Sequence, residues 1–336
     1  MDKNKKIVNS EYSVRTDLAV EAREIYKEKH HEKDIDGIEV TEEKNDDINV
    51  ITVNIKNDDA AIKMGKDKGT YITIEIPSYT HYDGTCMENV AKVLNMSLKK
   101  LFDLKKNQTA LVVGLGNIDI TPDALGPKVI KKIMVTRHLK NLMDKSSLED
   151  VRDVCAIAPG VLGVTGIETA EIIKAVVNKV KPDIVICIDA LAARRTERVN
   201  NTIQICDTGI SPGAGVKNNR TEINKKSLGC DVIAIGVPTV VDALTITNDT
   251  LDCVIDYLIK NSPNGSEFFK MLNNINRNEK MALINDAISS NVLKDMIVTP
   301  KEIDLIIDSL SEIISDGINL SIQQDMTYDE IKKFLK

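Results

Sequence analysis

Four short apolar runs in the middle of this 336-residue chain constrain its fold more than any other feature. They span residues 110–113, 154–158, 184–188 and 232–235, and turn signals bound each of them. Helical patterns near 128–143 and 166–179 separate the first three runs. Short strands that alternate with helices form parallel β-α-β units. We therefore predict an α/β fold with a mostly parallel sheet flanked by helices.

The sequence before these runs predicts an N-terminal β-rich extension. Residues 48–55 and 70–76 alternate apolar and polar side chains, which is typical of half-buried strands. A short helical pattern begins at Leu18, and residues 83–102 predict an amphipathic helix. A capping box formed by Thr165 and Glu168 is expected to begin the helix near 166–179.

The sequence after the runs predicts a linker and then helices. The linker is expected at 261–266, and the helical stretches at 266–275, 279–291, 300–315 and 327–335. We expect a polar arm at 1–17, an α/β domain at 18–260 and a C-terminal helical region at 261–336.

Composition argues against several classes of protein. The net charge of −7 opposes direct nucleic-acid binding, which needs a basic face. No run of 18 or more apolar residues is present, and no apolar segment follows the basic N-terminus, so we expect neither a membrane span nor a secretory signal. Six cysteines occur singly, as in proteins with reduced thiols in the cytoplasm.

Two aspartates lie where apolar runs are expected to enter loops. Asp123 follows the first run, and Asp189 comes directly after the third. In an open α/β sheet such loops gather at one edge, where ligands bind. Two carboxylates brought together there can share one proton and act as an acid/base pair.

Each aspartate also has a structural interpretation. Thr121, Pro122 and Asp123 resemble a helix start, with a cap, a proline and an acidic residue in the first turn. Asp189 follows a strongly apolar strand and is expected to be partly desolvated, so it needs a function or a partner. Arg194 or Arg195 would supply that partner.

Two glycine motifs resemble known sites but fail in detail. Gly114 and Gly116 begin a dinucleotide motif, yet its third glycine is replaced by Asp119, which would repel a pyrophosphate. The segment 209–213 matches a serine-nucleophile elbow, but Pro212 has no N–H for an oxyanion hole. The elbow also needs a later histidine, and the last histidine is His138.

The four histidines and six cysteines lack the spacing of a zinc site. A divalent ion held by Asp123, Asp189 and His138 stays an alternative. A histidine in this sequence context is more often simply on a helix face.

Several segments closely resemble the germination proteases of spore-forming bacteria. They are residues 12–23, 111–127, 136–139, 159–169, 189–194, 211–215 and 234–243. A more distant similarity joins the N-terminal half of the sheet to hydrogenase maturation endopeptidases. Residues 251–336 carry no recognised motif.

The resemblance implies a cytosolic endopeptidase of the forespore and spore core that degrades small acid-soluble spore proteins during germination. The family resembles atypical aspartic peptidases, and its two proposed catalytic residues match Asp123 and Asp189. Its members form homotetramers and are made as precursors that remove their own N-terminal segment. No cofactor, membrane or direct nucleic-acid partner is implied.

The N-terminal arm contains a sequence of the kind that such proteases cut. The family's substrates are cleaved after an acidic residue that is followed by an apolar residue and alanine. Asp17, Leu18 and Ala19 have this form, so we predict self-cleavage between Asp17 and Leu18.

The remaining predicted site residues bind the substrate. Backbone N–H groups near Gly114 and Gly116, and in segment 213–215, are expected to contact the developing oxyanion. Arg194, Arg195 or Arg220 is expected to bind the acidic residue before the cut. The alternatives are a metal-dependent peptidase or amidase that uses the same aspartates, and a non-catalytic module that binds spore proteins.

Overall fold

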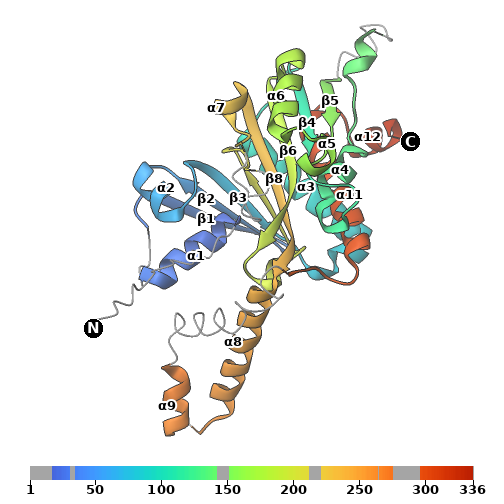
Figure 1. Ribbon diagram of the computed structural model, residues 1–336. Helices are drawn as coiled ribbons and strands as arrows, with labels where there is room; N and C mark the ends of the chain where they lie inside the picture. Colours follow the sequence, from blue (N-terminus) through green and yellow to red (C-terminus); the bar gives the residue numbers. More distant parts are fainter. Residues whose placement is uncertain are drawn as a thin grey trace.

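The computed structural model describes residues 17–30, 35–141, 151–211, 221–263, 265–274 and 296–335. Within them, nine strands form one sheet in the order β1-β2-β3-β7-β8-β6-β4-β5, with β9 (Ile297–Val298) paired to β8. Helices lie on both faces of this sheet (Figure 1). The predicted α/β class is confirmed.

The parallel half of the sheet corresponds to the four apolar runs. It consists of β5 (Asp153–Ile157), β4 (Thr109–Gly114), β6 (Ile184–Ala193) and β8 (Asp231–Asp242), paired in that order. β6 and β8 extend well beyond the predicted runs and stay paired as far as Ala193 and Val241.

The other half of the sheet is antiparallel. β1 (Ile38–Asn45), β2 (Ile48–Ile55), β3 (Gly69–Glu75) and β7 (Thr202–Cys206) lead from the edge to β8. β2 and β3 match the predicted β-rich extension, which joins the same sheet through β7. β1 was not predicted, because its second half is charged and exposed and carries no apolar alternation.

One face of the sheet is covered by α3 (Gly84–Leu101), α4 (Leu125–Ile130) and α11 (Ile303–Ile322). α11 lies near the C-terminus but is largely buried, and its aliphatic side chains pack against α3 and α4. Gly317 brings α11 close to α3, since a Cβ there would lie 2.6 Å from Leu94. The main core is therefore built from both ends of the chain.

The opposite face carries α1 (Ala19–His30) and α2 (Asp58–Met64) over the antiparallel half. α6 (Thr169–Val180) packs Ile173 and Val177 over the parallel half. Leu228 of the short helix α7 (Lys225–Leu228) packs against the same cluster. The short helix α5 (Leu162–Thr165) precedes α6 in the chain. α1, which begins directly after Leu18, therefore meets the sheet on this face.

The predicted capping box at Thr165 is wrong. Thr165 is the last residue of α5, and its hydroxyl donates to the carbonyl oxygen of Ile167. Gly166 then adopts a left-handed φ of 69° and separates α5 from α6, and Glu168 makes no capping hydrogen bond. The helix predicted at 128–143 is also shorter, because α4 ends at Ile130 and a 3-10 turn, η3 (Arg137–Asn141), follows.

Beyond β8 the chain forms a long helix, α8 (Ala243–Asn261), that extends away from the sheet to α9 (Glu267–Asn273) (Figure 1). The sequence pattern predicts α9 and α12 (Tyr328–Phe334) but not α8. The helix predicted at 279–291 lies outside the described residues. Among the described helices, none is long and apolar enough to cross a membrane.

Candidate active site

Asp189 lies inside β6 rather than at its end, which corrects the prediction. β6 continues to Ala193 because β8 accompanies it, whereas its pairing with β4 stops at Ile188. Asp189 is therefore the first residue of β6 beyond the reach of β4. The side chain is buried, with 7% of its surface exposed, and Oδ1 accepts a hydrogen bond from the N–H of Ala190 at 2.9 Å.

Asp123 ends the 3-10 turn η2 (Thr121–Asp123), in the loop that follows β4. Its Oδ2 accepts a hydrogen bond from the N–H of Asn117 at 2.7 Å. Gly116 makes this loop possible, because its φ is +109° and a Cβ there would lie 2.0 Å from the carbonyl oxygen of Asp123. The predicted cap is wrong, because Ile120 is the N-cap and Thr121 is the first residue of the turn, with Pro122 second. The Asp123 carboxylate is directed back into the loop.

The loop that carries Asp123 is attached to the strands beside Asp189. The N–H of Leu115 donates to the carbonyl oxygen of Ile188 at 2.8 Å. The hydroxyl of Thr239 on β8 donates to the carbonyl oxygen of Pro122 at 2.8 Å. Both predicted carboxylates thus lie just beyond the carboxyl-terminal end of β4, Asp123 in the loop that follows it and Asp189 inside β6.

The predicted cleavage junction is packed against the same part of the sheet. Leu18 and Ala19 are completely buried. The carbonyl oxygen of Asp17 accepts hydrogen bonds from Lys66 Nζ and Gln204 Nε2, both at 2.9 Å. The Asp17 carboxylate accepts one from the N–H of Ala192, on β6, at 3.3 Å. The junction therefore has defined contacts with β6 and β7.

Cross-strand register places this junction on the same face as Asp189. Asp189 pairs with Gly236 on β8, and Gly236 pairs with Gln204 on β7. Side chains of directly paired residues point to the same face of a sheet. Neighbouring strands are about 4.8 Å apart, so the Cα atoms of Asp189 and Gln204 are on the order of 10 Å apart.

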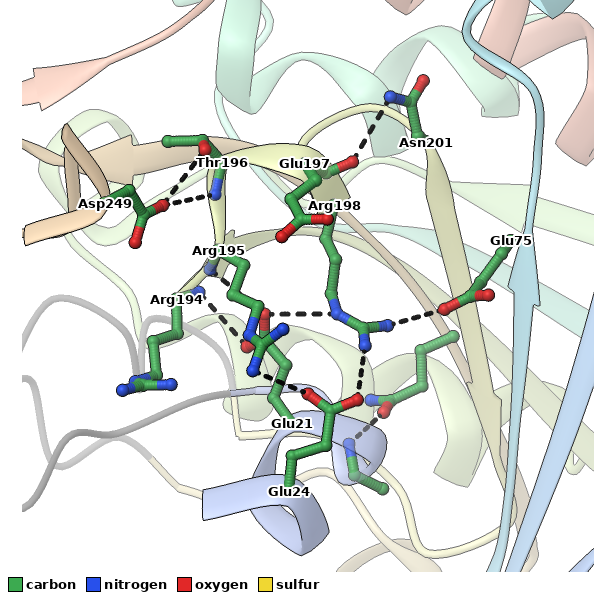
Figure 2. A network of polar contacts seen from close by, with 12 residues as sticks. Glu21, Glu24, Glu75, Arg194, Arg195, Thr196, Glu197, Arg198, Asn201 and Asp249 are labelled. Atoms are coloured by element: carbon green, nitrogen blue, oxygen red, sulfur yellow. Dashed lines mark hydrogen bonds and ion pairs between the residues drawn. The ribbon is translucent and has the colours of Figure 1, made fainter. Parts of the chain in front are cut away.

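The predicted arginines take part in holding α1. The backbone N–H groups of Arg194 and Arg195 each donate to the carboxylate of Glu21 at 3.2 Å. The Arg195 guanidinium lies 3.7 Å from a carboxylate oxygen of Glu24. Figure 2 shows these contacts between the end of β6 and the helix that follows the junction.

Arg198, which the sequence analysis missed, connects α1 to the sheet. It lies in η5 (Thr196–Arg198) and forms ion pairs with Glu24 at 2.8 Å and Glu75 at 2.9 Å. Its guanidinium is also 3.6 Å from Glu21, a carboxylate that is only 1% exposed (Figure 2). No pattern in the sequence distinguishes this arginine from its two neighbours.

The remaining predicted site residues lie in β4, in η3 or outside the described residues. Gly114 allows β4 to approach α4, since a Cβ there would lie 2.3 Å from the carbonyl oxygen of Gly126. Arg220 and segment 213–215 lie outside the described residues. His138 is exposed in η3. Across the described part of the chain, no group of at least three His, Cys, Asp or Glu side chains is arranged to hold a metal ion.

Comparison with known proteins identifies the family. The family model described as germination protease matches residues 19–272 and 259–335. The chain belongs to the germination protease family. It is 57% identical to the germination protease of Clostridium perfringens over 326 residues, which cover 96% of this chain and 99% of that protein.

More distant germination proteases also match almost the whole chain. The protein from Clostridium tetani is 54% identical, covering 96% of this chain and 99% of its own. The protein from Bacillus cereus is 39% identical, covering 95% of this chain and 96% of its own. This germination protease is therefore a peptidase that acts in spore germination, as the sequence predicts.

Proposed function

We propose that this germination protease is an aspartic-type endopeptidase that begins the degradation of small acid-soluble spore proteins in the spore core. It is made in the forespore as a precursor that removes residues 1–17. The observation that carries the proposal is the position of Asp123 and Asp189 beyond the carboxyl-terminal end of β4, with the Asp17–Leu18 junction packed on the face to which Asp189 points.

The proposed chemistry uses the two carboxylates as a pair that holds one proton. The ionised carboxylate accepts a proton from water, which attacks the peptide carbonyl carbon. The protonated carboxyl donates to the leaving amine. Such a pair titrates as a unit, so neither role is assigned to Asp123 or to Asp189 alone.

The surroundings of the junction support self-processing. An acidic residue at position 17 is followed by two side chains that are fully enclosed, Leu18 and Ala19. A larger side chain than that of Ala19 would need new space, which agrees with a preference for alanine two positions after the cut. The match to the family model begins at residue 19, directly after Leu18.

Self-association into homotetramers forms part of the proposal. α8 and α9 expose apolar side chains that a monomer leaves in water: Leu251, Val254, Tyr257, Leu258, Phe268 and Met271. Contiguous exposed apolar side chains of this kind are typical of protein–protein contacts. Light scattering of the purified protein measures the assembly directly. A monomer at micromolar concentration would contradict this part of the proposal.

The substrate proposal is tested by incubating the processed protein with a purified small acid-soluble spore protein. Mass spectrometry of the fragments should locate cuts after an acidic residue that precedes an apolar residue and alanine. A variant substrate with asparagine in place of that acidic residue should be cut much more slowly. Binding without any cut would favour the spore-protein-binding alternative.

A further inference from the structure

The carbonyl oxygen of Asp17 receives two hydrogen bonds from side chains that lie far from it in the sequence. Lys66 follows the C-cap of α2, and Gln204 lies in the middle of β7. Both donor atoms are 2.9 Å from the oxygen. This oxygen belongs to the peptide bond that the precursor is proposed to cut, so the two side chains contact the reacting group itself.

Gln204 holds the peptide on both sides of that bond. Its Nε2 donates to the carbonyl oxygen of Asp17, and its Oε1 accepts the N–H of Ala19 at 2.6 Å. One side-chain amide thus fixes the carbonyl before the cut and the N–H of the second residue after it. Such a contact sets the orientation of the intervening Leu18 peptide unit.

Lys66 is partly buried. Burial lowers the pKa of Lys66, although the nearby carboxylate of Asp17 acts in the opposite direction. A partly desolvated donor interacts more strongly with a developing negative charge than the same donor in water. The lysine is therefore placed where a charge on the Asp17 oxygen would need stabilisation.

We propose that Lys66 and Gln204 form the oxyanion-binding pair for self-processing at Asp17–Leu18. Water adds to the carbonyl carbon of Asp17, and the π electron pair moves to the oxygen that both side chains contact. The aspartate pair takes the proton from water. When the tetrahedral intermediate collapses, the bond to the Leu18 nitrogen breaks and that nitrogen receives a proton.

This inference rests on the proposed function but assigns residues that neither the sequence analysis nor the family match identified. The sequence predicts oxyanion donors in the glycine-rich loops after β4 and β7. The observed donors are side chains on the α1 face of the antiparallel half. Register places Gln204 and Asp189 on one face with only β8 between them, so the junction lies on the face that Asp189 shares.

The test measures self-processing of full-length precursor carrying single substitutions. Lys66→Met and Gln204→Leu remove a donor at nearly constant size. Each should slow the appearance of the Leu18 N-terminus by about 100-fold, the typical effect of removing one oxyanion donor. Lys68→Met, at a half-exposed position paired with Asp58 at the surface, is the matched control and should process at the wild-type rate.

Two conservative variants separate catalysis from anchoring. Gln204→Glu keeps an acceptor for the N–H of Ala19 but loses the donor to Asp17, so processing should still be slow in a folded protein. Lys66→Arg keeps a cationic donor and should process within about tenfold of wild type. Thermal unfolding midpoints show which variants are folded. If Lys66→Met or Gln204→Leu unfolds, Gln204→Glu and Lys66→Arg still test the proposal.

Three outcomes are distinguishable. Slow processing of folded Lys66→Met and Gln204→Glu, with wild type cut between Asp17 and Leu18, supports the oxyanion role of Lys66 and Gln204. Wild-type rates at that bond in both variants overturn the oxyanion role of Lys66 and Gln204 and leave the proposed function intact. Wild-type precursor that is never cut contradicts self-processing itself and removes the basis of this inference.

Discussion

Leu115 and Ile188 are joined by a 2.8 Å hydrogen bond from the N–H of Leu115 to the carbonyl oxygen of Ile188. Leu115 begins the loop that carries Asp123, and Ile188 directly precedes Asp189. This bond continues the pairing of β4 with β6 by one residue beyond the end of β4. It fixes the path of the Asp123 loop relative to the Asp189 strand.

Gly116→Ala should disrupt the site through Asp123. The new Cβ would lie 2.0 Å from the carbonyl oxygen of Asp123 and 3.0 Å from its Oδ1. The φ of +109° also adds backbone strain of about 1–3 kcal/mol for any residue but glycine. We expect peptidase activity to fall at least tenfold in a protein whose thermal unfolding shows that it is folded.

The matched control for Gly116 is Gly229→Ala. Gly229 also has a left-handed φ, of +79°, but a Cβ there meets nothing within 4 Å. This variant should lose about 1 kcal/mol of stability and keep its activity. Equal activity in both variants would show that the position of Asp123 does not limit the reaction.

Arg198→Met should destabilise the attachment of α1. Removing the guanidinium leaves the buried carboxylate of Glu21 without that charge partner, and Glu24 and Glu75 lose their ion pairs with Arg198. Breaking one partner of a buried ion pair costs about 3–5 kcal/mol. We expect urea unfolding to show a loss of unfolding free energy near the lower end of this range, because Glu24 and Glu75 are partly exposed.

Amide hydrogen exchange should place that loss in α1, which is held by the ion pairs of Arg198. The control is Lys92→Met, which breaks a surface pair with Glu88 and should change the free energy of unfolding by less than about 1 kcal/mol. If both variants were equally stable, Arg198 would not be the anchor of α1.

Stability should fall as the pH drops below about 6.5 because His81 is buried. Burial lowers the pKa of His81 below its usual value near 6.5. On acidification the unfolded chain therefore binds a proton at His81 before the folded protein does, which favours unfolding. The contribution of neutral His81 is present above pH 6.5 and is lost on acidification. Urea midpoints between pH 7.5 and pH 5 should therefore decrease.

The His81→Gln variant tests the cause of that decrease. Neutral His81 contacts Ser309 Oγ at 2.7 Å and the carbonyl oxygen of Asn200 at 3.1 Å, so the variant should be less stable at pH 7.5 but less sensitive to acid. His138→Gln, at an exposed position, is the matched control. An unchanged pH slope in His81→Gln would assign the acid sensitivity to other groups.

Chelation should leave the activity intact. Within the described residues, no group of at least three candidate ligands is arranged to hold a metal ion, and the proposed mechanism activates water with carboxylates. Exhaustive dialysis against a strong chelator should change the rate of substrate cleavage by less than about twofold. Loss of activity that added zinc or manganese restores would favour the metal-dependent alternative.

The parallel half of the fold was predictable because each of its strands is a short apolar run. A strand buried on both faces needs no alternation, and turn residues mark its ends. The antiparallel half was harder to predict from the sequence. β1 is charged over its second half, and β7 is only five residues long, so neither stands out from a loop.

The site was predictable only in part for a similar reason. Asp123 and Asp189 follow apolar runs, which places both beyond the carboxyl-terminal end of β4, but the continuation of β6 past Asp189 depends on its pairing with β8. Lys66 and Gln204 lie in the antiparallel half and reach the junction only through tertiary packing. Arg198 differs from Arg194 and Arg195 only in its surroundings, which local sequence does not record.

The account depends most on the two aspartates acting together. Asp123→Asn and Asp189→Asn keep the size of each side chain while removing its charge. Asp119→Asn, in the same loop as Asp123 but exposed, is the control. The direct measurement is N-terminal sequencing of each precursor during incubation. We predict a new N-terminus at Leu18 in wild type and Asp119→Asn, and none in folded Asp123→Asn or Asp189→Asn. Normal processing in either of these two variants would contradict the catalytic pair.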